Sequence, residues 1–436
     1  MRQSRLALIG IFAVLAACAQ QDPRLPGERL DIRALQTPAA ALQVDRAAPI
    51  RLSRQINNQS WTHRAGNADH AIQHPAFGTA PDLAWATPIG QGNDRRYRIT
   101  ADPVAADGRI FTLDSRATVA ATATSGASLW SRDLTPPGED AYDASGGGLA
   151  LGKGTLFVTT GFGELVALEA ASGAELWRQQ LDAAATGAPS VKGNQVFVVT
   201  RDARAWAIDT TSGRVKWQLA GTPSGTGVVG GAGPAIGNKL VIFPYGSTEM
   251  VAALRTGGLQ MWRSSVSGSR VGRVYAKITD ITGDPVLRGG VIYAGNPSGR
   301  TVAIDAEDGT RIWTAQEGAT GPVWVDGGAV FLISDQAELI RLNAANGGRV
   351  WGVPLPGIIP QRRARRERDV YANFGPVLAG GRLWVASGDG QLRGFDPVDG
   401  SLSYATALPG GAASRPIVVD KVMYLVSADG QLLAFD

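Results

Sequence analysis

Cysteine is almost absent from this chain, which has a single one, Cys18, among 436 residues. An internal disulfide is therefore excluded, and so are zinc sites built on pairs of cysteines. Histidine is nearly as scarce, and the three histidines lie close together at His63, His70 and His74. Beyond the N-terminal segment, no apolar run reaches the roughly 20 residues that a membrane-spanning helix needs.

An excess of charge of one sign is also missing from most of the chain. The formal net charge is +4, but the segment 361–369 alone holds five arginines against Glu367 and Asp369. Arg2 and Arg5 lie in a segment that we expect to be removed. The remainder is near neutral, which excludes a broad basic face for nucleic acid. The basic segment is either a solvated loop or a contact with anionic lipid or an acidic partner surface.

Common catalytic signatures are missing as well. The chain contains no G-x-S-x-G, H-E-x-x-H or paired-cysteine motif. The "GFG" group at 161–163 is not a phosphate-binding loop, because no helix follows whose N-terminus would face a phosphate. A metal site is one use of the histidine cluster, but no cysteine or close carboxylate pair completes a ligand set. We therefore interpret residues 60–75 as a capping loop that leads into the fold.

The N-terminus has the features of a bacterial lipoprotein signal. A basic start precedes an apolar stretch of about 12 residues, which is too short for a spanning helix. The stretch ends in Leu-Ala-Ala-Cys at 15–18. We predict a signal peptide at 1–17, lipidation of Cys18 and a tether over 18–57, with Ala19 favouring the outer membrane. The body is then periplasmic, and the lipids supply its membrane affinity.

One repeat dominates the chain from Trp61 onward. Seven fourteen-residue windows align without gaps, with glycine always at the tenth position and tryptophan or, once, tyrosine at the last. The windows are 117–130, 164–177, 204–217, 249–262, 300–313, 338–351 and 391–404. Their glycines are Gly126, Gly173, Gly213, Gly258, Gly309, Gly347 and Gly400, and their last residues are Trp130, Trp177, Trp217, Trp262, Trp313, Trp351 and Tyr404.

Each window is typical of a strand, a tight turn and a second strand, and a further apolar hairpin precedes it. The unit is thus four antiparallel strands, repeated every 38 to 53 residues. This period predicts an all-β, eight-bladed β-propeller over 58–436. Seven of the eight blades are completed by an outer strand that comes next in the sequence. The outer strand of the eighth blade must therefore come from the N-terminal side. Residues 81–89 fit, because Trp85 lies 45 residues before Trp130, and they would close the ring without an open edge.

The repeated residues have structural explanations. We expect the glycines to adopt a positive φ in the hairpin turn. The acids and amides at the sixth position can accept backbone N–H bonds in the same turn, and a ring of equivalent carboxylates is not a catalytic constellation. Each tryptophan suits a wedge between blades, with its indole N–H bonded to a carbonyl of the neighbouring blade. Stacking of a ligand on the tryptophans is the alternative.

The windows resemble the propeller repeat of the pyrroloquinoline-quinone (PQQ) proteins, with its A-x-D-x-x-T-G-x-x-x-W pattern, over roughly residues 60–436. The quinoprotein alcohol dehydrogenases of that family hold the quinone and a calcium ion in the ring. Many stack a disulfide of adjacent cysteines on the quinone, which this chain cannot form, and no unique set of calcium ligands stands out. A periplasmic quinone-dependent dehydrogenase is therefore an alternative function, and a general envelope adaptor is another.

With eight blades and a lipobox as well, the chain resembles the BamB family, lipoproteins of the outer-membrane β-barrel assembly (BAM) complex. The resemblance implies a scaffold without catalysis or cofactor that binds the periplasmic POTRA domains of BamA, and unfolded outer-membrane proteins as well.

In the BamB family two neighbouring interblade loops make that contact. One carries Leu-x-Leu-Arg-Gly, and here Val228 and Gly230 match its second Leu and its Gly, while Val229 replaces its Arg. The other carries Asp-x-Asp, of which Asp280 is kept and Thr282 replaces the second acid. An apolar patch anchored by Val228, beside one carboxylate, is the expected partner site.

Overall fold

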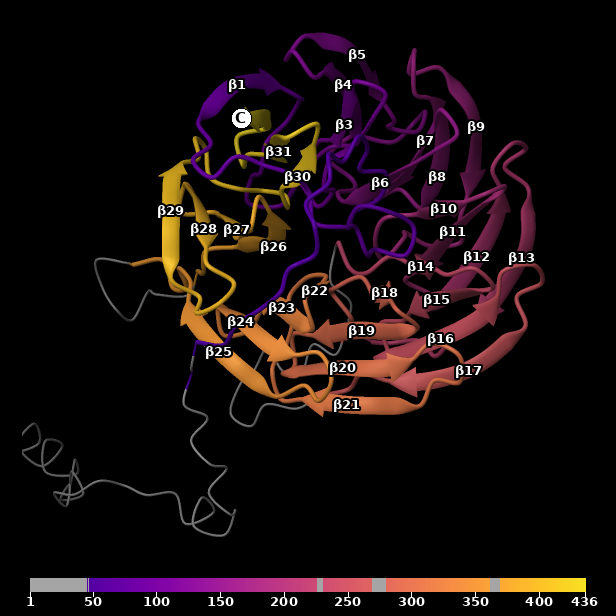
Figure 1. The fold of residues 1–436 in the computed structure, drawn as a ribbon. Helices are drawn as coiled ribbons and strands as arrows, with labels where there is room; N and C mark the ends of the chain where they lie inside the picture. The colour runs from indigo at the N-terminus through magenta and orange to yellow at the C-terminus, as the bar shows by residue number, and fades with distance from the viewer. Residues whose placement is uncertain (1–44, 46, 226–229, 269–279, 361–368) are drawn as a thin grey trace, which may run out of the picture. The chain divides into compact units, whose positions relative to one another are not determined.

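The computed structural model describes residue 45 and residues 47–225, 230–268, 280–360 and 369–436. The described chain is a ring of eight four-stranded antiparallel sheets, and it contains no helix (Figure 1). No described helix therefore has the length and apolar character needed to cross a membrane. The eight-bladed propeller expected from the repeat is confirmed. We number the blades in chain order, blade 1 starting at Val104.

The innermost strands line the axis of the ring. They are β2 (Val104–Ala106), β6 (Gly147–Gly152), β10 (Ser190–Lys192), β14 (Ala235–Ile236), β18 (Val286–Arg288), β22 (Trp324–Asp326), β26 (Asn373–Ala379) and β30 (Ile417–Val419). The second strands are β3 (Arg109–Leu113), β7 (Thr155–Thr160), β11 (Gln195–Thr200), β15 (Leu240–Pro244), β19 (Val291–Asn296), β23 (Ala329–Ile333), β27 (Arg382–Ser387) and β31 (Val422–Val426).

The third and outer strands come from the repeat windows. The third strands are β4 (Thr118–Ala123), β8 (Glu164–Glu169), β12 (Arg204–Asp209), β16 (Glu249–Leu254), β20 (Arg300–Asp305), β24 (Glu338–Asn343), β28 (Gln391–Phe395) and β32 (Gln431–Phe435). The outer strands are β5 (Ser128–Asp133), β9 (Glu175–Gln180), β13 (Val215–Ala220), β17 (Gln260–Ser265), β21 (Arg311–Ala315), β25 (Arg349–Pro354), β29 (Leu402–Ala407) and β1 (Leu83–Pro88).

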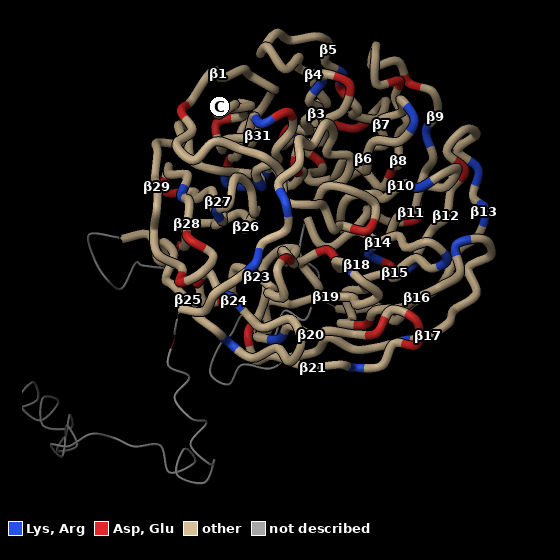
Figure 2. The backbone as a smooth tube through the Cα atoms, viewed as in Figure 1, with Lys and Arg blue, Asp and Glu red and all other residues tan. Residues whose placement is uncertain are grey.

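Burial follows from this layering. The second and third strands lie between two neighbouring blades, so both of their faces are covered and their sequences are almost continuously apolar. The outer strands alternate between exposed and half-buried residues. Basic and acidic residues are interspersed along these outer strands, without a face of one sign in this view (Figure 2).

The ring is closed by β1. This strand pairs antiparallel with β32, the last strand of the chain, and completes blade 8 beside the C-terminus (Figure 1). The expected closure by residues 81–89 is confirmed. Trp85 contacts Tyr424 of its own blade, with ring centroids 5.8 Å apart, and its indole also covers Gly126 of blade 1. The Tyr404 hydroxyl of blade 7 donates to the carbonyl of Pro81 at 3.2 Å.

The tryptophan wedges are confirmed in all six windows. Each indole N–H donates to a backbone carbonyl of the next blade, at 2.8 to 3.3 Å. The sixth-position side chain accepts turn N–H bonds at Asp209, Asp305, Asn343 and Asp396, as expected. Glu169 instead accepts from the hydroxyl of Ser172.

The window glycines have a second role that the sequence did not reveal. All seven have a positive φ, between +69° and +89°, as expected for the turn. In addition, a Cβ on any of them would lie only 2.5 to 2.9 Å from the tryptophan of the preceding blade. The turn therefore offers a bare backbone surface on which the indole packs, which explains why glycine and tryptophan repeat together.

Two adjacent glycines provide a matched test of this packing. In Gly258→Ala the new methyl would lie 2.7 Å from Trp217 at a φ of +73°, so we expect a loss of about 2–3 kcal/mol in unfolding free energy. A Cβ at Gly257 meets nothing within 4 Å, so Gly257→Ala should leave stability nearly unchanged. Denaturant titration of both variants measures the difference, and equal stabilities would contradict the packing role.

A segment that precedes the closing strand contacts every blade. We call residues 48–77 the strap. Its bonds to the innermost hairpins run from blade 8 (Asp420 N–Asn58 O), blade 1 (Trp61 N–Ala105 O), blade 2 (Leu151 N–Thr62 O), blade 3 (Val191 N–His63 Nε2), blade 4 (Ile236 N–Ala68 O) and blade 5 (Leu287 N–Asp69 O) to blade 6 (Ser53 N–Asp326 Oδ1) and blade 7 (Gly380 N–Pro75 O). The strap therefore holds the whole ring from the side of the innermost turns.

The histidine cluster belongs to the strap, and the structure bears out its interpretation as a capping loop. His63, His70 and His74 are buried, and each bonds a backbone group. Burial, with His70 nearby, lowers the pKa of His63 to about 3. The imidazole of His63 is thus neutral, and its Nε2 accepts the Val191 N–H at 3.0 Å. The described residues contain no group of three or more His, Cys, Asp and Glu suited to a metal ion.

The last part of the predicted tether, 18–57, also contacts the ring. Its residues 18–44 and 46, like the signal peptide 1–17 and the lipidation site Cys18, lie outside the described residues. Arg341 donates to the carbonyl of Ala48 at 2.6 Å, and Arg349 pairs with Asp45 at 3.1 Å. Contact with the propeller therefore begins well before residue 58.

Candidate partner-binding face

The connections between blades gather on the face opposite the innermost turns. In a four-stranded antiparallel blade, the outer strand ends on the face opposite the turn between the first two strands. The innermost strand of the next blade begins on that same face, so the connection between them lies there. The three segments that interrupt the repeat, 222–234, 268–285 and 356–374, are such connections. Of the expected partner residues, Val228 and Val229 lie outside the described part of the chain, whereas Gly230, Asp280 and Thr282 are described.

The described ends of the first two connections are bonded to each other. The N–H of Ala232 donates to the carbonyl of Ile281 at 3.2 Å, and the N–H of Gly233 donates to the Asp284 carboxylate at 2.7 Å. The two connections that the family resemblance singles out are thus neighbours in space as well as in blade order. Gly230, at a φ of +78°, lies at the start of this contact.

Asp280 and Thr282 face the protein rather than solvent. Only 3% of Asp280 is exposed, and the half-buried Thr282 hydroxyl donates to the carbonyl of Ala319 at 3.5 Å. A partner would reach the Asp280 carboxylate only after a local rearrangement. The role of these residues in partner binding therefore stays a prediction, and burial gives Asp280 a part in shaping the connection.

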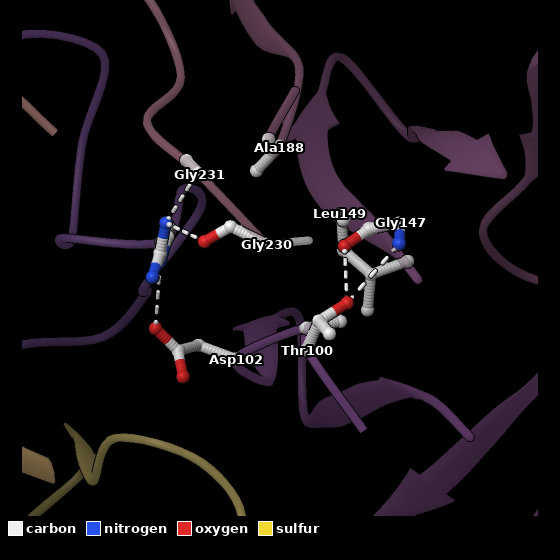
Figure 3. A pocket seen from close by; sticks show the side chains of 11 residues that line it. Thr100, Asp102, Gly147, Leu149, Ala188, Gly230 and Gly231 are labelled. Atoms are coloured by element: carbon white, nitrogen blue, oxygen red, sulfur yellow. Dashed lines mark hydrogen bonds and ion pairs between the residues drawn. The ribbon is translucent and has the colours of Figure 1, made fainter. Parts of the chain in front are cut away.

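A cluster of four charged residues lies beneath these connections, at the axis. Arg64 extends from the strap, and its Nε donates to the Asp102 carboxylate at 3.2 Å. One Nη of Arg64 reaches Asp284 at 3.3 Å and the carbonyls of Gly230 and Gly231 at 3.3 and 2.7 Å. Figure 3 shows Asp102, Gly230 and Gly231 converging on this guanidinium.

Arg415 completes the cluster from blade 8. Its backbone N–H donates to Asp102 at 2.7 Å, and its guanidinium donates to the carbonyls of Pro322 and Gly375 at 2.9 and 3.0 Å. The cluster therefore joins the strap to blade 1, blade 8 and the entrances of blades 4 to 7. Two cations balance two carboxylates, so the cluster as a whole is neutral.

Burial and the neighbouring charges shift the pKa values of these groups. Burial raises the pKa of Asp102 above its usual value, although Arg64 and Arg415 oppose the shift. Burial lowers the pKa of Arg415 to about 10, against the attraction of Asp102. For Arg64 the attraction of Asp284 and Asp102 outweighs burial, so its pKa is raised. The pKa of Asp102 thus depends on the charges of Arg64, Arg415 and Asp284. Loss of one partner from such a buried network typically costs about 3–5 kcal/mol of unfolding free energy.

The cluster was missed in the sequence, although the repeat contains its signal. One residue lies at an equivalent place near the start of the innermost strand in every blade, and proline follows it in seven blades. Five of these residues are small: Gly148, Ala188, Gly233, Gly321 and Gly375. The other three are Asp102, Asp284 and Arg415. Charged residues at a position that lines the axis of the ring break the repeat, and this break is the sequence signal of the cluster.

A cavity of about 590 Å³ opens beside the axis between blades 6 and 7. Its walls include the turn 334–337 and the two arms of the connection 356–374, and Arg64 and Arg415 also line it. An antiparallel bridge joins the arms at Ile358 and Val370, which are 59% and 66% exposed. In the sequence, the basic segment 361–369 connects these two arms. Its residues 361–368 lie outside the described part of the chain.

The residues at the axis do not fit a bound quinone. The space between Arg64, Asp102 and the small residues of blades 2 to 4 has no room for even a water molecule. Figure 3 shows residues that line this space. A flat aromatic cofactor would have to displace the buried ion pairs. We therefore derive no step through a quinone at this place.

Comparison with known proteins identifies the family. A family model described as outer membrane protein assembly factor BamB matches residues 114–353 and 361–436. The chain belongs to the BamB family. BamB of Yersinia pestis is 23% identical over 363 residues, which cover 82% of this chain and 89% of that protein. The crystal structure of BamB from Moraxella catarrhalis superimposes with a TM-score of 0.68 at 19% identity, over 82% of this chain and 100% of that chain.

One dehydrogenase that shares the repeat is a more partial relative in sequence. Quinohemoprotein alcohol dehydrogenase ADH IIB of Pseudomonas putida is 29% identical, over 54% of this chain and 35% of that protein. Its similarity reflects the common propeller repeat, whereas the BamB match extends over most of the ring. BamB proteins are outer membrane assembly factors by name, which agrees with the function implied by the sequence.

Proposed function

We propose that this protein is a lipid-anchored scaffold of the BAM complex on the periplasmic face of the outer membrane. It binds the POTRA domains of BamA through the neighbouring connections 222–234 and 268–285 and assists the folding and insertion of outer-membrane proteins. It carries out no catalysis and needs no cofactor. Membership of the BamB family supports this role, and so does the lipobox at Cys18.

One structural observation carries the proposal beyond family membership. The described ends of the two connections are bonded through Ala232 and Ile281, so one partner domain can contact both ends. A small interface of this kind depends on a few anchor residues at its centre. Val228 is the anchor expected from the sequence.

The test is co-purification from the envelope. The full chain with an affinity tag should retain BamA, and a Cys18→Ser variant should move from the membrane fraction to the soluble periplasmic fraction. Retention of a quinone with a saturable optical change, and no BamA, would favour the dehydrogenase alternative. Recovery of neither would leave the general envelope adaptor as the better description and would refute the scaffold.

A further inference from the structure

Arg64 is the point where the strap reaches the two connections. Its guanidinium accepts no bond and donates several: to the carbonyls of Gly230 and Gly231 in one connection, and to Asp284 at the end of the other. Asp284 in turn accepts the N–H of Gly233 at 2.7 Å. One side chain thus fixes both connections where they enter blades 4 and 5.

The rest of the cluster holds Arg64 itself in place. Asp102 binds its Nε at 3.2 Å and also accepts the N–H of Arg415. Asp102 and Asp284 are 6% and 1% exposed, so water does not compete for these bonds. The strap residue Trp61, 1% exposed, forms two backbone bonds with Ala105 and fixes the base of the Arg64 loop.

Simple ring closure does not require this arrangement. Five blades have glycine or alanine at the position of Asp102, Asp284 and Arg415, so the inner strands pack without charge there. The charged exceptions come from blades 1, 5 and 8. Among the four charged side chains, Arg64 donates to the ends of the connections that enter blades 4 and 5, whereas Arg415 donates to the entrances of blades 6 and 7. The bonds that Arg64 donates to Asp102, Asp284 and the two glycine carbonyls are directional, so they specify one geometry more strictly than apolar contacts do.

We propose that Arg64 is a positioning residue for partner binding, which holds the described ends of the two connections, 230–234 and 280–285, from the axis of the ring. This inference rests on the proposed function, because it assigns a purpose to the geometry of that same surface. The partner is the POTRA region of BamA, and Arg64 does not contact it. The guanidinium acts through Gly230, Gly231 and Asp284.

The experiment compares Arg64→Lys with Gly258→Ala in the full chain. Lysine keeps the charge but loses the planar fork that serves several acceptors at once. Gly258→Ala weakens blade 4 at its outer turn without touching the cluster, so it controls for general destabilisation. Two quantities are measured: amide hydrogen exchange at Ala232 and Gly233, and the dissociation constant for purified POTRA domains of BamA.

For Arg64→Lys we expect exchange at Ala232 and Gly233 at least about 10-fold faster, and POTRA binding about 10-fold weaker. Gly258→Ala should not speed exchange at Ala232 and Gly233 more than at other amides, and it should leave POTRA binding unchanged. Exchange equal to that of the control, or unchanged binding despite faster exchange, would overturn the inference. If the unaltered chain does not bind POTRA domains, the proposed function fails, and the exchange rates alone decide whether Arg64 positions the connections. A third variant, Arg64→Met, removes the charge and should show a larger effect on both measurements if it folds.

Discussion

Replacing β1, Leu83–Pro88, by a glycine and serine sequence of equal length is expected to destabilise the whole ring. The replacement removes the pairing with β32 and the contacts of Trp85 with Tyr424 and Gly126. Loss of a large aromatic contact alone typically costs about 3–5 kcal/mol. The unpaired edge of β32 would add to this and promote aggregation.

The measurement is a thermal melt with a matched control. The expected fall in melting temperature is about 10 °C, since a loss of 1 kcal/mol lowers it by roughly 2 °C in a large domain. Replacement of the exposed residues 137–139, in the connection between blades 1 and 2, by glycine and serine should leave the melt unchanged. If the β1 variant melts with the unaltered chain, the closure is not what stabilises the ring.

A chain that starts at residue 78, and so lacks the strap, is expected to lose more than about 5 kcal/mol of unfolding free energy. It loses the buried side chains of Trp61 and Phe77, each worth about 3–5 kcal/mol by truncation. It also leaves Asp102 and Asp284 buried without Arg64. The packing at the axis should therefore be destabilised as well as the innermost turns.

A chain that starts at Asp45 is the control for this truncation. It keeps every contact between the strap and the ring, so its denaturant midpoint should match that of the full chain. The chain from residue 78 should unfold at a clearly lower denaturant concentration, with loss of POTRA binding. Identical midpoints for the two truncations would show that the strap does not stabilise the ring.

The repeat made the blades, the closing strand and the tryptophan wedges predictable from the sequence. Each of these features recurs, so one window explains the others, and the missing eighth outer strand identified β1. The second role of Gly258 and its equivalents was not predictable, because it depends on the tryptophan of a neighbouring blade.

The strap and the axial cluster could not be derived in the same way. The strap has no periodicity, and its course follows the innermost turns, which are hundreds of residues apart in sequence. Arg64, Asp102, Asp284 and Arg415 meet only because the ring closes. The site on the two connections was reached through family resemblance, and Asp280 is more buried than a contact residue at a partner surface would be.

The central claim is that the connections 222–234 and 268–285 bind the POTRA domains of BamA. The most direct measurement is a calorimetric titration of the full chain, kept in detergent, with these domains. Val228→Asp should weaken binding about 30-fold, the effect of losing a central anchor. Val370→Asp places the same charge on an exposed apolar residue of a different connection and should leave binding unchanged. Undiminished binding of Val228→Asp, or equal losses in both variants, would contradict the account.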